Sequence, residues 1–106
     1  MLEIGTRRLI WEAVKERVYF FCDGRMSAEV LRVLSVAGAE GREHYPTTLF
    51  AAEEAYQGAC TARSTIYSAN IAAGLMLGQF TRFLRGMPVD ADLQFNILAS
   101  DLTFAA

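Results

Sequence analysis

The sequence predicts an α/β domain built around one long, almost entirely apolar helix. Residues 61–85 contain the run STIYSANIAAGLMLGQF, whose apolar side chains cover every side of a helical wheel. Short β-branched and aromatic runs lie on both sides of it, at residues 18–22 and 93–97. The chain of 106 residues is the size of one ordinary domain, so we expect a single core over residues 1–106.

The composition narrows the class of protein. Hydrophobic residues make up 53% of the chain and charged residues 21%, which is typical of a folded domain and not of a disordered one. The formal net charge is −2 and the basic residues are scattered, so we expect no nucleic-acid partner. Cys22 and Cys60 lack the spacing of a disulfide framework, and the N-terminus lacks the pattern of a secretory signal. These features predict reduced thiols and a cytoplasmic location.

The N-terminal segment is expected to form an amphipathic helix over residues 6–17. Its apolar residues recur every three or four positions, and charged residues occupy the rest of the wheel. The aromatic run at residues 18–22 follows as a short buried strand. Residues 28–36 suit a helix by their spacing and a strand by their valine content, so the pattern alone leaves them undecided.

The motif Asp23-Gly24-Arg25 follows this run directly. Asp-Gly is the commonest turn chemistry, so we expect the strand to end there, with Arg25 pairing locally to Glu29. The alternative is a ligand-facing role for these side chains, because strand ends in α/β folds often carry such groups.

Residues 37–48 contain two glycines and a proline and predict a loop, followed by a short helix at residues 49–57 that Gly58 ends. His44 in this loop is expected to be solvated. Because the chain has one histidine, no second imidazole is available to build a metal site with it, and we expect none.

Beyond the long helix, Gly86-Met87-Pro88 breaks the helical pattern. Alternating apolar and polar residues at 93–97 predict a strand with one buried face. A turn at residues 99–101 and a second antiparallel strand at 102–104 complete the chain.

A helix that is apolar on all sides is either buried all round or placed in a bilayer. Arg63 and Arg82 bracket 18 residues, which is close to the minimum for a membrane span. Asn70 and Gln79 lie inside that span, and the flanking strands need a helix as cover, so we expect burial and no membrane. The small residues are expected to allow close approach of the sheet or of a partner helix; they are Ala69, Ala72, Ala73, Gly74 and Gly78.

Cys60 is the candidate catalytic nucleophile. It precedes the long helix, where backbone N–H groups and the positive end of the helix dipole stabilise a thiolate. His44 is the one imidazole that could activate it, and the alternative is that Cys60 simply packs. The chain has neither a G-x-G-x-x-G motif nor a Walker loop, so it lacks the phosphate cradle of a self-sufficient nucleotide site.

Several segments follow one another in a recognisable order: Arg7 and a helix over 9–14, a strand into Asp23-Gly24, a strand over 29–36, Cys60 before the Ala/Gly-rich helix, Arg85-Gly86-Met87-Pro88 and Leu93-Gln94-Phe95-Asn96. In this order they resemble the second half of the ThiF/MoeB/HesA adenylyltransferases, the bacterial relatives of ubiquitin-activating enzymes. The resemblance covers nearly the whole chain. It implies a partial ThiF-like fold, a mixed or antiparallel sheet of about four strands packed against the long central helix and the N-terminal amphipathic helix. Residues 28–36 are a strand in that fold.

The resemblance also implies an activity. Members of the family activate the C-terminal carboxylate of a ubiquitin-like or sulfur-carrier protein by adenylation with ATP and magnesium, and they generally work as dimers. Their glycine-rich ATP loop belongs to the first half of the fold, which would lie upstream of Met1. This chain is therefore expected to be a truncated or split product that supplies the dimer surface and docks the carrier protein, binds neither ATP nor magnesium alone, and is inactive by itself.

Two residues match family positions of functional interest, Arg7 as a cofactor-binding residue and Cys60. In members that form no thioester, the matching cysteine is not a nucleophile. The acidic residue that the family places five positions before the arginine falls on Leu2, with Glu3 one position away, and the aspartate that commonly ends the family's strand motif is Asn96. Two alternatives stay open: a stand-alone module that self-associates through the long helix, and a residual enzyme that uses Cys60.

Overall fold

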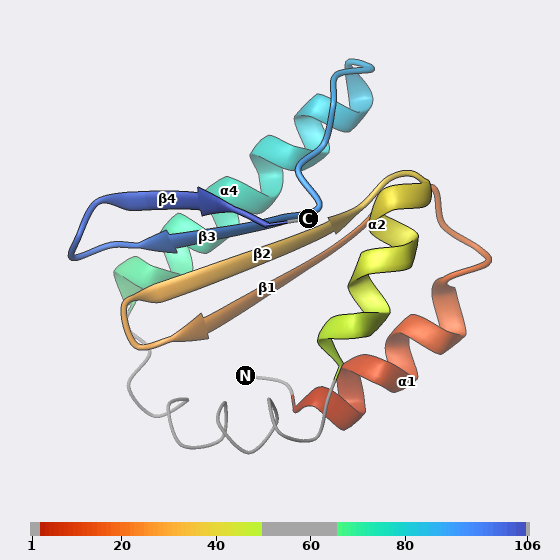
Figure 1. The fold of residues 1–106 in the computed structure, drawn as a ribbon, viewed down its shortest axis with the longest axis horizontal. Helices are drawn as coiled ribbons and strands as arrows, with labels where there is room; N and C mark the ends of the chain where they lie inside the picture. Colours follow the sequence, from red (N-terminus) through yellow and green to blue (C-terminus); the bar gives the residue numbers. More distant parts are fainter. Residues whose placement is uncertain (1–2, 50–65, 106) are drawn as a thin grey trace.

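The computed structural model describes residues 3–49 and 66–105. Its elements follow in the order α1 (Ile4–Val14), β1 (Phe21–Ser27), β2 (Val30–Val36), α2 (Ala39–His44), the 3-10 helix η1 (Tyr45–Thr48), α4 (Ile66–Leu84), β3 (Asp92–Asn96) and β4 (Asp101–Phe104). The four strands form one antiparallel sheet in the order β1-β2-β3-β4. Figure 1 shows α4 on one side of this sheet, with α1 and α2 on the other. The predicted α/β class, with four strands and a long helix, is confirmed.

The strand β1 begins and ends later than the sequence pattern predicts. Asp23 lies opposite Leu34 and Gly24 opposite Val33, so both residues sit inside the β1–β2 ladder. The predicted turn at Asp23-Gly24 is therefore wrong. The chain turns instead around Ala28, whose φ is 56°. Residues 28–36, undecided by pattern, contain the strand β2, as the resemblance implies.

Ala39–His44 and Tyr45–Thr48 are helical, which corrects the loop predicted over residues 37–48. Gly41 was expected in that loop, but it lets α2 lie directly on β2: a Cβ at this position would be 2.8 Å from the carbonyl oxygen of Ser35. Pro46 stands at the start of η1, where its missing N–H costs nothing. The predicted helix at residues 49–57 falls, apart from Leu49, outside the described residues.

The helical prediction for the long apolar segment is confirmed over α4, while residues 61–65 lie outside the described part. The expectation of burial on every side is wrong. The side chains of Ser68, Ala72 and Gln79 are buried, whereas the opposite face of α4 is exposed. Of the five small residues that were expected to allow close approach, Ala72 is the one that is buried. Among the helices that the structure describes, none is long and apolar enough to cross a membrane.

The end of α4 follows a familiar geometry. Gly86 has a φ of 70°, and the N–H of Met87 bonds to the carbonyl oxygen of Arg82 at 2.9 Å. This is the Schellman arrangement, in which a glycine without a Cβ takes the left-handed position. The chain then returns to the sheet as β3, whose Leu93 is buried while Gln94 is exposed, and the predicted strand pair at the C-terminal end is confirmed.

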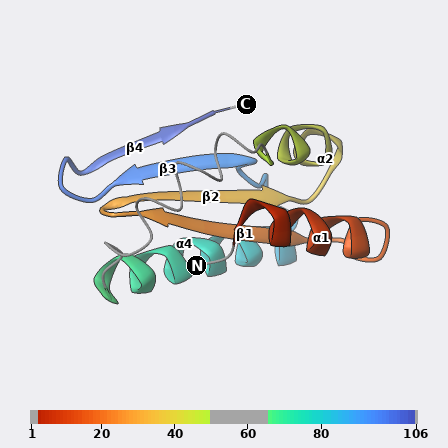
Figure 2. The same cartoon turned by 90° about the horizontal axis from the view of Figure 1, so that it is seen from below.

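The two faces of the sheet bury different side chains. On the face of α1 and α2, one apolar cluster consists of Ile4, Trp11, Leu34, Val36, Tyr45 and Leu49, with Phe21 packed against it. Three of its rings, Trp11, Phe21 and Tyr45, lie 5.0 to 5.2 Å apart between centroids. On the other face, Met76 of α4 lies against Gly24 of β1. Figure 2 shows the same layers from a second direction.

Candidate functional site

A buried ionic cluster joins α1, β1 and η1. Its centre is the carboxylate of Asp23, which accepts hydrogen bonds from Arg7 Nε at 2.9 and 3.0 Å and from Arg25 Nε at 3.1 Å. The hydroxyl of Tyr45 donates to the same carboxylate at 2.9 Å. Asp23 and Arg25 share one face of β1 because strand side chains alternate with a period of two. We call Arg7, Asp23, Arg25 and Tyr45 the Asp23 cluster.

Arg25 extends this cluster to the end of η1. Its guanidinium donates to the carbonyl oxygen of Thr48 at 3.1 Å and to the Thr48 hydroxyl at 2.8 Å. Burial and the neighbouring Asp23 carboxylate together raise the pKa of Tyr45 far above its ordinary value of 10.0. The tyrosine therefore stays a neutral donor, and the cluster fixes the backbone at Thr48 relative to β1.

The two charged residues singled out in the sequence thus have structural partners. Arg7 is almost completely buried, and besides Asp23 it donates to the carbonyl oxygen of Gly24 at 3.3 Å. Its role as a cofactor-binding residue stays a prediction. The expected local pair of Arg25 with Glu29 is wrong, because Arg25 binds Asp23 and Thr48, while Glu29 accepts a hydrogen bond from the hydroxyl of Tyr67.

A second ionic cluster lies on the same face of the sheet, and sequence reasoning missed it. Arg32 of β2 binds the carboxylate of Asp92 with two hydrogen bonds, Nε to Oδ1 at 3.1 Å and Nη2 to Oδ2 at 2.8 Å. His44 Nε2 lies 2.7 Å from Asp92 Oδ2, so the expectation of a solvated histidine is wrong. Burial raises the pKa of Asp92, but the hydrogen bonds from Arg32 and His44 outweigh it, and the pKa is lowered from 3.8.

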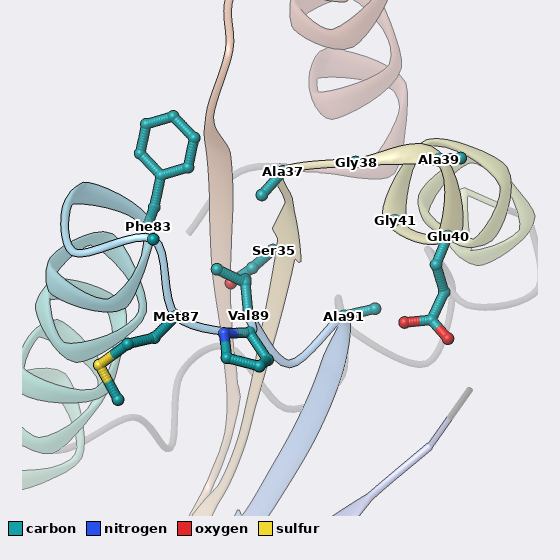
Figure 3. A pocket seen from close by; sticks show the side chains of 12 residues that line it. Ser35, Ala37, Gly38, Ala39, Glu40, Gly41, Phe83, Met87, Val89 and Ala91 are labelled. Carbon is teal, nitrogen blue, oxygen red and sulfur yellow. The ribbon is translucent and has the colours of Figure 1, made fainter.

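A cavity of about 470 Å³ opens between α2 and the connection from α4 to β3 (Figure 3). Its walls are mostly small or apolar; the lining residues are Ser35, Ala37, Gly38, Ala39, Glu40, Gly41, Phe83, Gly86, Met87, Pro88, Val89 and Ala91. Glu40 also lines a second hollow of about 170 Å³ together with Asp90 and Asp92. The first cavity is therefore an apolar hollow with one acidic side chain at its rim.

The lining of the cavity offers little reactive chemistry among the described residues. The one hydroxyl in its lining, on Ser35, lies 3.5 Å from the Sγ of Cys22. Burial raises the pKa of the Cys22 thiol, so this thiol is held in its less nucleophilic, protonated form. Gly38 and Gly41 can be picked out in the sequence. The packing of α2 on the sheet, which forms the cavity, cannot.

The remaining site predictions concern Cys60 and bound ions. Cys60 lies outside the described residues, so its role as a nucleophile stays a prediction. Within residues 3–49 and 66–105, no group of three His, Cys, Asp or Glu side chains is placed to hold a metal ion. Arg7, the predicted nucleotide contact, is engaged by Asp23.

The chain was also compared with known proteins. No family model, no curated relative and no solved structure matches it.

Proposed function

We propose that this chain is the C-terminal part of a ThiF-like adenylyltransferase, and that it docks a ubiquitin-like or sulfur-carrier protein whose C-terminal carboxylate the whole enzyme activates. The observation that carries the proposal is the order and placement of its elements. The resemblance implies a strand at residues 28–36, a helix that packs on the sheet, and two antiparallel strands after that helix. The elements β2, α4, β3 and β4 stand at those positions.

Among the described elements both β1 and β4 are edge strands, and the β1 edge supports a second half of the fold. β1 has seven residues and pairs with β2 along its whole length, while no described strand lies on its other side. Unpaired backbone N–H and C=O groups along such an edge are suited to accept a further strand. A nucleotide-binding half could therefore continue the same sheet at β1, and the Asp23 cluster would hold this strand rigid at the junction.

Nucleotide chemistry is assigned to that other half. The chain has no glycine-rich phosphate loop. Adenylation joins the carrier carboxylate to AMP and releases pyrophosphate, and ATP supplies the adenylyl group. The contribution of this chain is to position the carrier protein and to present the sheet edge.

Thermal melting of the isolated chain tests this division of labour. Addition of ATP and magnesium is expected to leave the melting temperature unchanged, because a ligand stabilises a protein only when it binds the folded state. Addition of candidate carrier proteins from the same genome is expected to raise it. A clear shift with ATP and none with any carrier would contradict the proposal.

A second candidate function is self-association through α4. It is supported by the exposed apolar side chains of this helix. The helix turns several large apolar side chains toward solvent, among them Ile66, Leu77 and Leu84. Contiguous exposed apolar surface of this kind marks an interaction site. A dimer would agree with either function, since the family works as dimers.

A further inference from the structure

The helix α4 exposes large apolar side chains on its outer face, while its inner face buries Ser68 and Gln79 beside apolar residues such as Ala72. The side chains of Ser68 and Gln79 are buried against the sheet, and Gln79 is held there by hydrogen bonds with Asp90. Ile66, Leu77 and Leu84 instead point away from the sheet, with exposed fractions of 80%, 64% and 66%. A helix on a protein surface normally turns polar residues toward solvent.

The exposed residues form a regular stripe. Six positions follow one another at alternating spacings of four and three residues, and all six are exposed: Ile66, Asn70, Ala73, Leu77, Phe80 and Leu84. A spacing that averages 3.5 residues is the a/d pattern by which one helix packs against another. We call these six residues the outer stripe. It runs over about 27 Å of helix, at 1.5 Å per residue.

Within the outer stripe, Phe80 packs against Phe20, with ring centroids 5.4 Å apart, and no described helix or strand lies over the rest. Figure 2 shows α4 with the sheet along one side and no described helix or strand beyond it. The four large apolar side chains of the stripe are 40% to 80% exposed, and Tyr67 at its flank is 45% exposed, so the stripe offers apolar surface to a partner. Residues 66–81 contain no charged side chain, so two copies of the stripe can meet without electrostatic repulsion.

We propose that the outer stripe is the contact between two copies of this chain, paired as parallel α4 helices in the same register. The inference deepens the self-association candidate above and rests on it. A two-fold axis parallel to the helices brings each residue of the stripe opposite its own copy. The same apolar positions then fill the holes between one another, as in a short two-stranded coiled coil.

Asn70 favours a parallel over an antiparallel orientation of the two α4 helices. In register, its amide lies opposite the amide of the second copy, and the two can share a hydrogen bond. A single asparagine at such a position is known to select two-stranded, in-register pairing. An antiparallel pair centred on the stripe would instead set Asn70 against Phe80 and bury the amide without a partner, which is costly.

Sedimentation velocity on the whole chain tests whether the stripe is the contact. The wild-type chain is expected to dimerise, and Leu77→Asp to weaken the dimer at least ten-fold, since a carboxylate would be buried in the apolar contact. Leu98→Asp is the matched control, because Leu98 is 77% exposed in the β3–β4 turn, and it should dimerise as the wild type does. A monomeric wild type, or equal effects of the two variants, would overturn the proposal.

Cross-linking tests the register. In a parallel pair, Ala73→Cys places two introduced thiols opposite each other, and mild oxidation is expected to give a covalent dimer whose disulfide peptide mass spectrometry identifies. Leu98→Cys is expected to give none. A dimer that does not cross-link through position 73 would refute the parallel register. Since neither experiment involves ATP or a carrier protein, its failure would be distinguishable from a failure of the adenylyltransferase proposal.

Discussion

Arg7 of α1 and Asp23 of β1, which are 16 positions apart in the chain, form an ion pair between the two elements. Arg7 Nε lies 2.9 Å from Asp23 Oδ1, and the side chains are 5% and 10% exposed. The same carboxylate receives Arg25 and Tyr45. One aspartate in the middle of a strand therefore connects the N-terminal helix, the sheet edge and the turn η1.

Removal of the central carboxylate should be strongly destabilising. Asp23→Asn is expected to lower the free energy of unfolding by about 3 kcal/mol or more, because it leaves buried guanidinium groups without their anion. Urea denaturation followed by circular dichroism measures the change. Asp101→Asn is the matched control: Asp101 is exposed in β4, and its loss should change the free energy by under about 0.5 kcal/mol. Equal effects of the two substitutions would contradict the role given to Asp23.

The shape of the Arg25 side chain should matter as well as its charge. Arg25→Lys is expected to cost about 1–3 kcal/mol, because an ammonium group cannot bind Asp23 and Thr48 with the fork geometry of a guanidinium. Arg85→Lys, at an exposed position beyond α4, serves as the control. If both lysine variants melt at the wild-type temperature, the contacts of Arg25 do not contribute to stability.

Two glycines in helices should respond oppositely to alanine. A Cβ at Gly41 would lie 2.8 Å from a backbone oxygen and 2.9 Å from the Cα of Val36, so Gly41→Ala is expected to cost about 1–3 kcal/mol. A Cβ at Gly5 in α1 meets nothing within 4 Å, so Gly5→Ala is expected to add about 0.5–1 kcal/mol. Thermal melts of both variants measure this. A stable Gly41→Ala would mean that α2 does not rest on β2 as closely as described.

The contacts of Asp92 with Arg32 and His44 should make the stability of the protein depend on pH. Because the pKa of Asp92 is lowered in the folded protein, its stabilisation is complete above the ordinary value of 3.8 and is lost as the pH falls through the folded-state value. The free energy of unfolding of the wild type should therefore fall more steeply below pH 3.8 than that of Asp92→Asn. Asp101→Asn should follow the wild-type curve. If the free energy of unfolding of wild type and Asp92→Asn falls equally steeply below pH 3.8, the stabilising role given to Asp92 is contradicted.

The two cysteines offer an internal comparison for the residual-enzyme alternative. Burial raises the pKa of the Cys22 thiol, so Cys22 is expected to react slowly with iodoacetamide near neutral pH. If Cys60 is a nucleophile, it should react faster than a free thiol under the same conditions. Peptide mapping after timed alkylation separates the two sites. An ordinary or slow rate at Cys60 would remove the alternative.

Local sequence patterns predicted the regular elements well where they reflect burial on one face. The alternation at residues 93–97 is an example. The patterns gave wrong predictions where tertiary contacts override the local preference of the residues. Asp23-Gly24 has turn chemistry, yet the ladder with Leu34 and Val33 and the contact of Met76 with Gly24 hold it in a strand. Gly41 was read as a loop residue because the sequence does not show the strand that lies beneath it.

The ionic clusters could not be predicted from the sequence for a related reason. Arg32 and Asp92 are 60 residues apart, and His44 and Asp92 are 48 apart. Their meeting depends on the register of β2 against β3, which places Asp92 opposite Leu34, and on α2 lying over the same face. The alternation of side chains along β2 and β3 predicts which residues of each strand share a face. It predicts neither the register between the two strands nor the position of α2.

The most direct test of the central claim is ATP–pyrophosphate exchange. The chain is combined with a candidate nucleotide-binding half from the same genome, and exchange is measured with and without a carrier protein and with a carrier shortened at its C-terminus. Exchange should require both halves and the intact carrier, and the 106-residue chain alone should give none. Carrier-dependent exchange by the nucleotide-binding half without this chain, or exchange by this chain alone, would contradict its role as the carrier-docking part of an adenylyltransferase.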